Sequence, residues 1–518
     1  MRAPPTFRSG RILAAILALL LQTLPAWGRE LRVVDPQGLD GPERALLASI
    51  QGVLNRTGAV VWVQGPGMNA RILDDLRGEG WVLREASGPW SLLREYRQAF
   101  AGLIIGQVGT ESLNGATTLA GLTNAVVADP SLVDRLVAEG WPVLADARSR
   151  STATLWAETR ARVTRGVMVH QEPTKTLHLR DLAISLGAWT VYTETASERI
   201  HQVQALGPHT RVFGWGRDEL EFVGEVSRGG GAVIPADWSL NLSALRHLPA
   251  ALPVPPRPGK PRARQAGERV VAFVVTDGDN LQWVGGRFVD DPGFWASPLR
   301  GRFAVTWEMP PEARIVAPRV LERILRSATP LDDFIAGPSG YGYQFPGLLP
   351  DRQAAAAETA RSVARVHWPL VTLLNAGDGP DPSDAWLDRP EIRGVLYKDY
   401  APYNRGRGAV RWHRGKPRVA YRFLLWEFRN SSGGLRPEAL PEGVARNIGS
   451  LPAGADAGAD AFALVNVHAW SFRESGGPMG AIGRTVAGLP PGVRVVTASE
   501  FFELMAAEAP SRDGKKGD

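Results

Sequence analysis

The sequence predicts an α/β protein in two parts. Residues 29–248 are expected to form an α/β domain with a mostly parallel sheet, and residues 269–508 a TIM-like (β/α)8 barrel, complete or distorted and seven-stranded. Three observations lead to this prediction. Short β-rich runs alternate with helical patterns along the whole chain, eight such runs follow residue 269, and a proline-rich segment at 249–268 separates the two parts as an extended linker.

The first 28 residues are typical of an export signal. Three basic residues, Arg2, Arg8 and Arg11, precede an apolar stretch at Ile12–Leu21, and small residues end at Gly28. About ten residues at roughly 1.5 Å each cannot cross a hydrocarbon layer about 30 Å thick. We therefore expect cleavage near Gly28, a periplasmic or secreted protein, and no stable membrane span after cleavage. The polar tail at 509–518 is expected to be disordered.

The composition excludes several kinds of chemistry. The 518 residues include no cysteine, so disulfides, thiolate metal sites and a cysteine nucleophile are excluded. The formal net charge of +6 is small for this length, and no dense basic run occurs outside the linker, so we expect no nucleic-acid partner. No glycine-rich phosphate loop follows a predicted strand, and we expect no cofactor.

The predicted elements of the first part follow from apolar periodicity. A helix at Pro42–Arg56 places its apolar residues on one face. Short runs of β-branched and aromatic residues predict strands at Leu31–Val34, Val60–Val63, Leu103–Ile105, Ala125–Val127, Val167–Val169, Trp189–Tyr192, Val212–Phe213 and Ala232–Ile234. Strands that alternate with helices predict a parallel sheet covered on both faces.

The second part gives the barrel prediction. Helical patterns at Pro318–Arg326 and Arg352–Val366 separate some of its β-rich runs. These runs are Val270–Val275, Phe303–Trp307, Phe334–Ile335, Leu370–Leu374, Gly394–Tyr397, Val419–Leu425, Phe462–Val467 and Val493–Thr497. Eight β-α units in this length fit a (β/α)8 barrel, whose reactive groups lie at the carboxyl ends of the strands.

Acidic, aromatic and amide side chains follow these strands. The candidate catalytic carboxylates are Asp277, Asp279, Glu308 and Asp399. Glycosidic cleavage needs one carboxylic acid to protonate the leaving oxygen and a second carboxylate as nucleophile or base. Rings stack on the C–H faces of sugars, and amides and acids bind hydroxyls. The candidate substrate-binding residues are Asn280, Trp283, Ser339, Tyr341, Tyr343, Asn375, Asp378, Lys398, Tyr400, His468 and Trp470.

The Asp277–Asn280 segment also fits other structures. It could cap a helix or form a tight turn. A calcium loop is excluded because Leu281 and Gln282 stand where a further ligand and a glycine are required. An aspartate-nucleophile phosphatase would need a downstream lysine and acidic pair, for which Lys398 and Asp399 are a poor match.

One motif carries a family resemblance. The stretch at 340–346, Gly-Tyr-Gly-Tyr-Gln-Phe-Pro, is similar to the G-x-G-Y-x-Y-P signature of the GxGYxYP family of glycoside hydrolases, with Phe345 in place of the last tyrosine. Further stretches that resemble the family are Ser49–Arg56, Leu119–Leu122, Leu179–Asp181, Pro235–Ser239, Thr276–Trp283 and Val467–Ser471. The resemblance implies an N-terminal α/β domain, a TIM-barrel-like C-terminal domain and a carbohydrate substrate.

Three functions are consistent with these residues. The first is an exported glycoside hydrolase that uses carboxylates and no metal. The second is a metal-dependent polysaccharide deacetylase-like hydrolase, in which His468 and one aspartate would hold a metal, with His413 or His367 as a second histidine. The third is a glycan-binding protein without catalysis. We expect the N-terminal domain to brace the barrel or to form one wall of the cleft.

Overall fold

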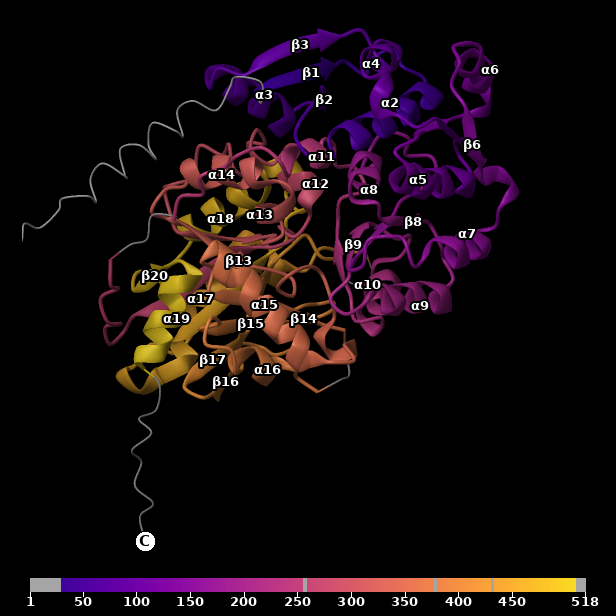
Figure 1. Cartoon of the computed structure of the whole chain (residues 1–518). Coiled ribbons are helices and arrows are strands. Elements are labelled where there is room, and N and C mark those ends of the chain that lie inside the picture. The colour runs from indigo at the N-terminus through magenta and orange to yellow at the C-terminus, as the bar shows by residue number, and fades with distance from the viewer. Residues whose placement is uncertain (1–28, 255–258, 377–379, 430–432, 509–518) are drawn as a thin grey trace, which may run out of the picture.

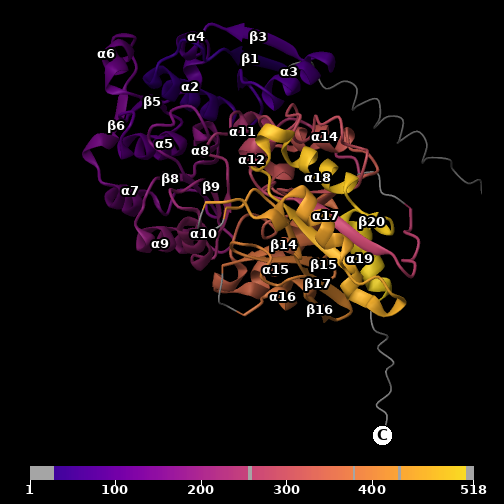
Figure 2. The same ribbon diagram turned by 180° about the vertical axis from the view of Figure 1, so that it is seen from behind.

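The computed structural model describes residues 29–254, 259–376, 380–429 and 433–508. The expected export signal, the expected disordered tail and Asp378 lie outside these residues. The N-terminal part forms an arc along one side of the C-terminal part, from α3 and β3 at one end to α9 and α10 at the other (Figures 1 and 2). None of the described helices is both long enough and apolar enough to cross a bilayer.

The N-terminal part contains three small parallel sheets instead of one. Their orders are β2-β1-β3, β5-β4-β6 and β10-β9-β7-β8. The strands are β1 Glu30–Val34, β2 Val61–Val63, β3 Val82–Ala86, β4 Leu103–Ile105, β5 Val126–Ala128, β6 Val143–Asp146, β7 Val167–His170, β8 Trp189–Val191, β9 Arg211–Gly214 and β10 Ala232–Ile234. All eight predicted strands are present. Sequence patterns missed β3 and β6 because both are largely exposed edge strands without a buried apolar run.

Helices cover these sheets. They are α2 Gly41–Leu54, α3 Met68–Gly78, α4 Pro89–Glu95, α5 Glu111–Thr123, α6 Pro130–Ala138, α7 Thr152–Thr159, α8 Arg180–Leu186, α9 Ala196–Leu206, α10 Glu219–Arg228 and α11 Leu242–Leu245. The predicted helix at 42–56 is α2. It begins after Asp40, whose side chain accepts a hydrogen bond from the Glu43 amide, and proline occupies its first turn.

The C-terminal part is built on one large curled sheet with the order β16-β17-β15-β14-β13-β12-β11-β19-β18, and β20 pairs with β11. Its strands are β11 Arg269–Val275, β12 Val305–Met309, β13 Asp332–Ala336, β14 Leu370–Asn375, β15 Gly394–Asp399, β16 Val410–His413, β17 Lys416–Ala420, β18 Phe423–Leu425, β19 Phe462–Val467 and β20 Val493–Val495. Its helices are α12 Leu281–Val284, α13 Ala313–Val316, α14 Pro318–Arg326, α15 Arg352–Val366, α16 Ser383–Leu387, α17 Pro441–Gly449, α18 Gly477–Ala487 and α19 Ala498–Ala507.

The α/β class is confirmed, whereas a TIM barrel is not. In a (β/α)8 barrel the eighth strand lies between the seventh and the first, but here β19 pairs directly with β11. The last strand, β20, pairs with the other edge of β11. It pairs with Arg269–Val271 at the start of β11, and β12 pairs with Val274 and Val275 at the end of β11 on the same edge. The sheet is also mixed, because β16 is antiparallel. One segment, Lys416–Leu425, supplies both β17 near one end of the sheet and β18 at the other.

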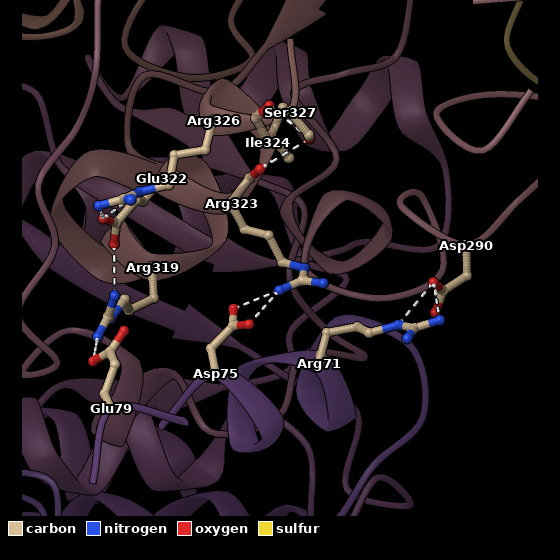
Figure 3. Close-up of polar contacts among 10 residues, drawn as sticks. All are labelled: Arg71, Asp75, Glu79, Asp290, Arg319, Glu322, Arg323, Ile324, Arg326 and Ser327. Atoms are coloured by element: carbon tan, nitrogen blue, oxygen red, sulfur yellow. Dashed lines mark hydrogen bonds and ion pairs between the residues drawn. The ribbon is translucent and has the colours of Figure 1, made fainter. Parts of the chain in front are cut away.

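Ion pairs join the two parts where α3 and the residue after it, Glu79, face α14 and Asp290 (Figure 3). Arg323 binds Asp75 at 2.5 Å, and Arg71 binds Asp290 at 3.2 Å. Arg319 pairs with Glu79 of the N-terminal part and, at 2.8 Å, with Glu322 of its own helix. The described residues of the predicted linker form neither helix nor strand.

Candidate active site

The segment after β11 is a tight turn that carries two acids. Asp277 has a left-handed backbone (φ 64°) and accepts a 2.5 Å hydrogen bond from the Thr276 hydroxyl. Gly278 lies directly against the backbone of β12, since a Cβ atom there would be 1.4 Å from the Glu308 carbonyl oxygen. Asn280 ends the turn, and its side chain caps α12 by accepting from the Trp283 amide at 3.2 Å. The turn chemistry of this segment thus fixes Asp277 and Asp279 at the carboxyl end of β11.

Glu308 and Lys398 form a buried ion pair on the inner face of the curled sheet. The Lys398 Nζ lies 3.4 Å from Glu308 Oε1, and the side chains are 3% and 0% exposed. The Tyr421 hydroxyl donates to the same oxygen at 3.5 Å. Lys398 lies on β15 and Tyr421 just after the neighbouring strand β17, whereas Glu308 lies on β12, which β13 and β14 separate from β15. Their contact shows that the inner face curls round on itself.

Asp279 lies in an acidic environment. It is 7% exposed, and burial, together with the negative charges of Asp277, Glu308 and Glu219, holds its pKa well above the usual range, although Lys398 opposes the shift. Burial also raises the pKa of Glu308 against the effect of Lys398. A carboxyl group with a raised pKa holds its proton to a higher pH and is therefore better suited to act as a general acid.

Sequence reasoning missed Glu219, the acid that the N-terminal part contributes. It begins α10 and accepts a 2.6 Å hydrogen bond from the Tyr343 hydroxyl. Burial raises its pKa, and Asp277 raises it further. An acid in the first turn of a helix is usually explained by the helix dipole, so the sequence offered no reason to place it in a site.

Stacked rings lie beside the acids. Trp426 stacks on His468, with centroids 4.2 Å apart and an interplanar angle of 14°, and on Tyr403 at 5.3 Å and 17°. The Lys398 ammonium lies 5.2 Å from the Tyr403 centroid. Burial lowers the pKa of His468, so its imidazole is neutral at pH 7. All three rings are partly exposed, and such rings combine an apolar face with a polar edge.

The signature motif lies at the junction of the two parts. The backbones of Tyr343 and Val233 exchange two hydrogen bonds of 2.8 Å, which adds the loop to the edge of β10. Tyr341 is fully buried, with its hydroxyl 3.2 Å from His209 Nδ1 and the Arg211 guanidinium 5.0 Å from its ring. Tyr341 is therefore not exposed for sugar stacking, and Tyr343 reaches the acid cluster only through its hydroxyl.

Two further residues of this junction are buried as well. The Ser339 hydroxyl donates to the Gln344 carbonyl at 2.9 Å and accepts from the Leu374 amide at 3.0 Å. Phe345, which replaces the last tyrosine of the signature, is fully buried, and its amide donates to the Ser227 hydroxyl at 2.9 Å. These contacts hold the loop in place.

The remaining predicted residues make packing contacts and hydrogen bonds within the protein. Trp283 is 9% exposed and packs edge-on against Trp470, with centroids 5.0 Å apart. Asn375 accepts from the Gly347 amide at 2.9 Å. Two partly exposed residues remain near the rim: Asp399, which accepts from the Tyr397 hydroxyl at 2.9 Å, and Tyr400, whose pKa burial raises to about 12.

The histidines proposed for a metal site do not meet. His468 binds the Ser471 hydroxyl at 3.0 Å, whereas His413 lies on β16 and binds Asp388 at 2.8 Å. His367 ends α15, before β14 begins and so at the opposite end of the sheet. Among the described residues, no three His, Cys, Asp or Glu side chains form a group that could hold a metal ion.

The fold and the site define a two-part α/β protein with an acid cluster at the carboxyl ends of parallel strands, the usual position of active sites in such sheets. The chain belongs to the GxGYxYP family. Residues 268–506 match the model described as "GxGYxYP putative glycoside hydrolase C-terminal domain", and residues 100–160 and 165–247 match the family's second and third N-terminal domains.

One solved structure is similar over almost the whole chain. It is the crystal structure of a protein from Bacteroides thetaiotaomicron VPI-5482, described as a putative hydrolase, at 25% sequence identity and a TM-score of 0.83. The similarity covers 93% of this chain and 95% of that one. No match was found among curated proteins.

Proposed function

We propose that the protein is an exported glycoside hydrolase that cleaves an oligosaccharide or polysaccharide by carboxylate acid–base chemistry at the carboxyl ends of the curled sheet. The observation that carries the proposal is a buried Asp279 with a raised pKa, two residues from the more exposed Asp277. The family description and the description of the similar structure support hydrolysis. The finer proposal for the fold is a distorted barrel that the segment Lys416–Leu425 closes.

The roles follow from protonation and position. Asp279 donates its proton to the glycosidic oxygen as the bond to the anomeric carbon breaks, and its burial keeps that proton in place. The carboxylate of Asp277 attacks the anomeric carbon or activates a water molecule. Lys398 limits the repulsion among the acids, and the stacked rings of Tyr403, Trp426 and His468 support the sugar.

The test compares two substrates that differ in leaving group. Mature protein, residues 29–518, is assayed on oligosaccharides and on the matching dinitrophenyl glycosides, whose leaving group needs no proton. Asp279→Asn is expected to lower kcat/KM, which reports the bond-breaking step, about 10²–10⁴-fold on oligosaccharides and far less on dinitrophenyl glycosides, whereas Asp277→Asn lowers it on both.

Asp74→Asn removes an acid that is 64% exposed and distant from the cluster, and it should leave both activities unchanged. An Asp279→Asn variant with the same loss on both substrates would contradict the acid role. Saturable glycan binding without turnover by any variant would identify a binding protein instead.

Export is tested separately. The full chain is expressed in a bacterium, and the mass and N-terminal sequence of the protein outside the cytoplasm are determined. We expect a chain that begins at residue 29, because the apolar stretch is too short to anchor the protein. An uncleaved chain that stays in the cytoplasm would overturn this proposal.

A further inference from the structure

A cavity lies in the N-terminal part, whose residues alone line it. Its volume is about 690 Å³, which is within the usual range for small-molecule sites. It opens where strands of two sheets end: Asp35 follows β1, Gln64 follows β2, residues 172–178 follow β7, and Trp238 lies shortly after β10. Crevices at the carboxyl ends of parallel strands are where open α/β sheets bind their ligands.

Trp238 is the feature of this cavity that needs explanation. It is 57% exposed, and among the described residues it is the one aromatic side chain of the large hydrophobic residues that lie exposed on the surface. The ring is nevertheless held in place. The Lys175 ammonium lies 4.6 Å from its centroid, the His178 ring lies edge-on at 5.0 Å, and the Trp238 amide donates to Gln282 Oε1 at 2.6 Å. An exposed indole that is fixed by its neighbours is a preorganised stacking surface.

The charges around the cavity indicate the class of ligand. The acids Asp35 and Glu172 balance the cations Arg44 and Lys175, and Lys175 also pairs with Asp237. Burial lowers the pKa of His178 to about 4, so this ring adds no charge at pH 7. A phosphate group or polyanion would need a net positive lining. The lining suits a neutral ligand with many hydroxyl groups and one apolar face.

We propose that this cavity is a second carbohydrate-binding site, separate from the acid cluster, in which a neutral sugar unit stacks on Trp238. The sugar class of the ligand rests on the proposed function, whereas the existence of the site rests on the cavity and Trp238. Such a site would hold one part of a long glycan while another part is cleaved, which raises the effective concentration of substrate at the acids.

The test measures binding and cleavage in the same variants. Binding of neutral hexasaccharides of glucose, xylose, mannose and N-acetylglucosamine is measured by calorimetry in the Asp277→Asn/Asp279→Asn background. Adding Trp238→Ala is expected to weaken binding of at least one of them by 10-fold or more, and Gln64→Ala by about 2- to 10-fold. Val82→Ala, at a side chain 47% exposed on β3, should change nothing. Thermal unfolding confirms that each variant is folded.

The outcomes separate this inference from the proposed function. With active acids, Trp238→Ala should leave kcat and KM for a small dinitrophenyl glycoside unchanged and raise KM for the polysaccharide. Binding that depends on Trp238 without hydrolysis by any variant would support this site and refute the proposed function. Two results would overturn the inference. One is hydrolysis together with hexasaccharide binding that is unaltered in Trp238→Ala. The other is stronger binding of a hexamer of galacturonic acid than of every neutral hexamer.

Discussion

Substitution of Gly278 by alanine tests the geometry of the acid-bearing turn. The added Cβ would lie 1.4 Å from the Glu308 carbonyl oxygen, whereas ordinary contact begins at 3.4 Å. The turn must therefore move by about 2 Å, because the obstacle is backbone and not the end of a flexible side chain. Asp277 and Asp279 flank the glycine and must move with it.

The expected losses follow from that displacement. A misplacement of about 1 Å can cost about 10²-fold in rate, so Gly278→Ala should lower kcat by at least about 10²-fold. Overpacking of this kind costs about 1–3 kcal/mol in the free energy of unfolding. The assays are steady-state hydrolysis of a dinitrophenyl glycoside and urea unfolding followed by fluorescence.

A second glycine gives the control. An alanine Cβ at Gly58 would meet nothing within 4 Å, so Gly58→Ala should change neither property. Activity of Gly278→Ala within threefold of the wild type, at unchanged stability, would refute the reasoning, since the turn would then tolerate a displacement that should separate its acids from the substrate.

Four further substitutions, in three experiments, test the charges. Lys398→Met should lower the free energy of unfolding by about 3–5 kcal/mol, because it leaves Glu308 buried without its cation; the double variant with Glu308→Gln should lose less by urea unfolding. Because the pKa of Asp279 is raised in the folded state, native protein binds more protons than unfolded protein above about pH 4, and stability falls as pH rises. Asp279→Asn should therefore gain stability relative to wild type between pH 5 and 8. A difference in urea midpoint between variant and wild type that does not change with pH would argue against the raised pKa of Asp279. Arg319→Ala should cost about 1.5–3 kcal/mol, measured in the same way, because Glu322 is 4% exposed and loses a partner; a cost near zero would mean that this junction adds no stability.

The strands could be predicted from the sequence because most are continuous apolar runs buried in parallel sheets. Seven of the eight predicted runs of the C-terminal part each overlap one strand, whereas the eighth, Val419–Leu425, is divided between the end of β17 and β18. Their order could not be predicted in the same way. In a barrel, Val493–Val495 would lie between β19 and β11, whereas in this structure it pairs with the other edge of β11. Long-range packing decides between these two positions, because the local sequence pattern of the strand is the same in both.

The candidate site was predicted in part. Asp277, Asp279, Glu308 and Lys398 were predicted because each lies near the end of a strand, and the structure brings them into one electrostatic cluster. The same rule could not indicate Glu219, since it lies on a helix of the other part and joins the cluster only through the fold.

For the signature motif, the sequence did not show whether its glycines and aromatic rings contact a ligand or pack inside the protein. Gly340 has a φ of 114°, and a Cβ there would be 2.4 Å from the Thr359 hydroxyl oxygen. Tight packing within the protein therefore requires this glycine, although a glycine beside tyrosines is also expected at a ligand. The buried rings of Tyr341 and Phe345 likewise fit a junction between domains. Sequence alone does not distinguish an aromatic loop that faces a ligand from one that faces another domain.

The junction gives the N-terminal part a direct role in the site. The segment after β10 binds α12 twice: the Gln282 amide donates to the Pro235 carbonyl at 3.2 Å, and Gln282 Oε1 accepts from the Trp238 amide. Helix α12 begins directly after the turn that carries Asp277 and Asp279. A displacement of the segment that presents Trp238 would therefore be transmitted to the turn through hydrogen bonds. The proposed sugar site and the acid cluster are consequently held in fixed relation, which is what a single long glycan bound at both sites would require.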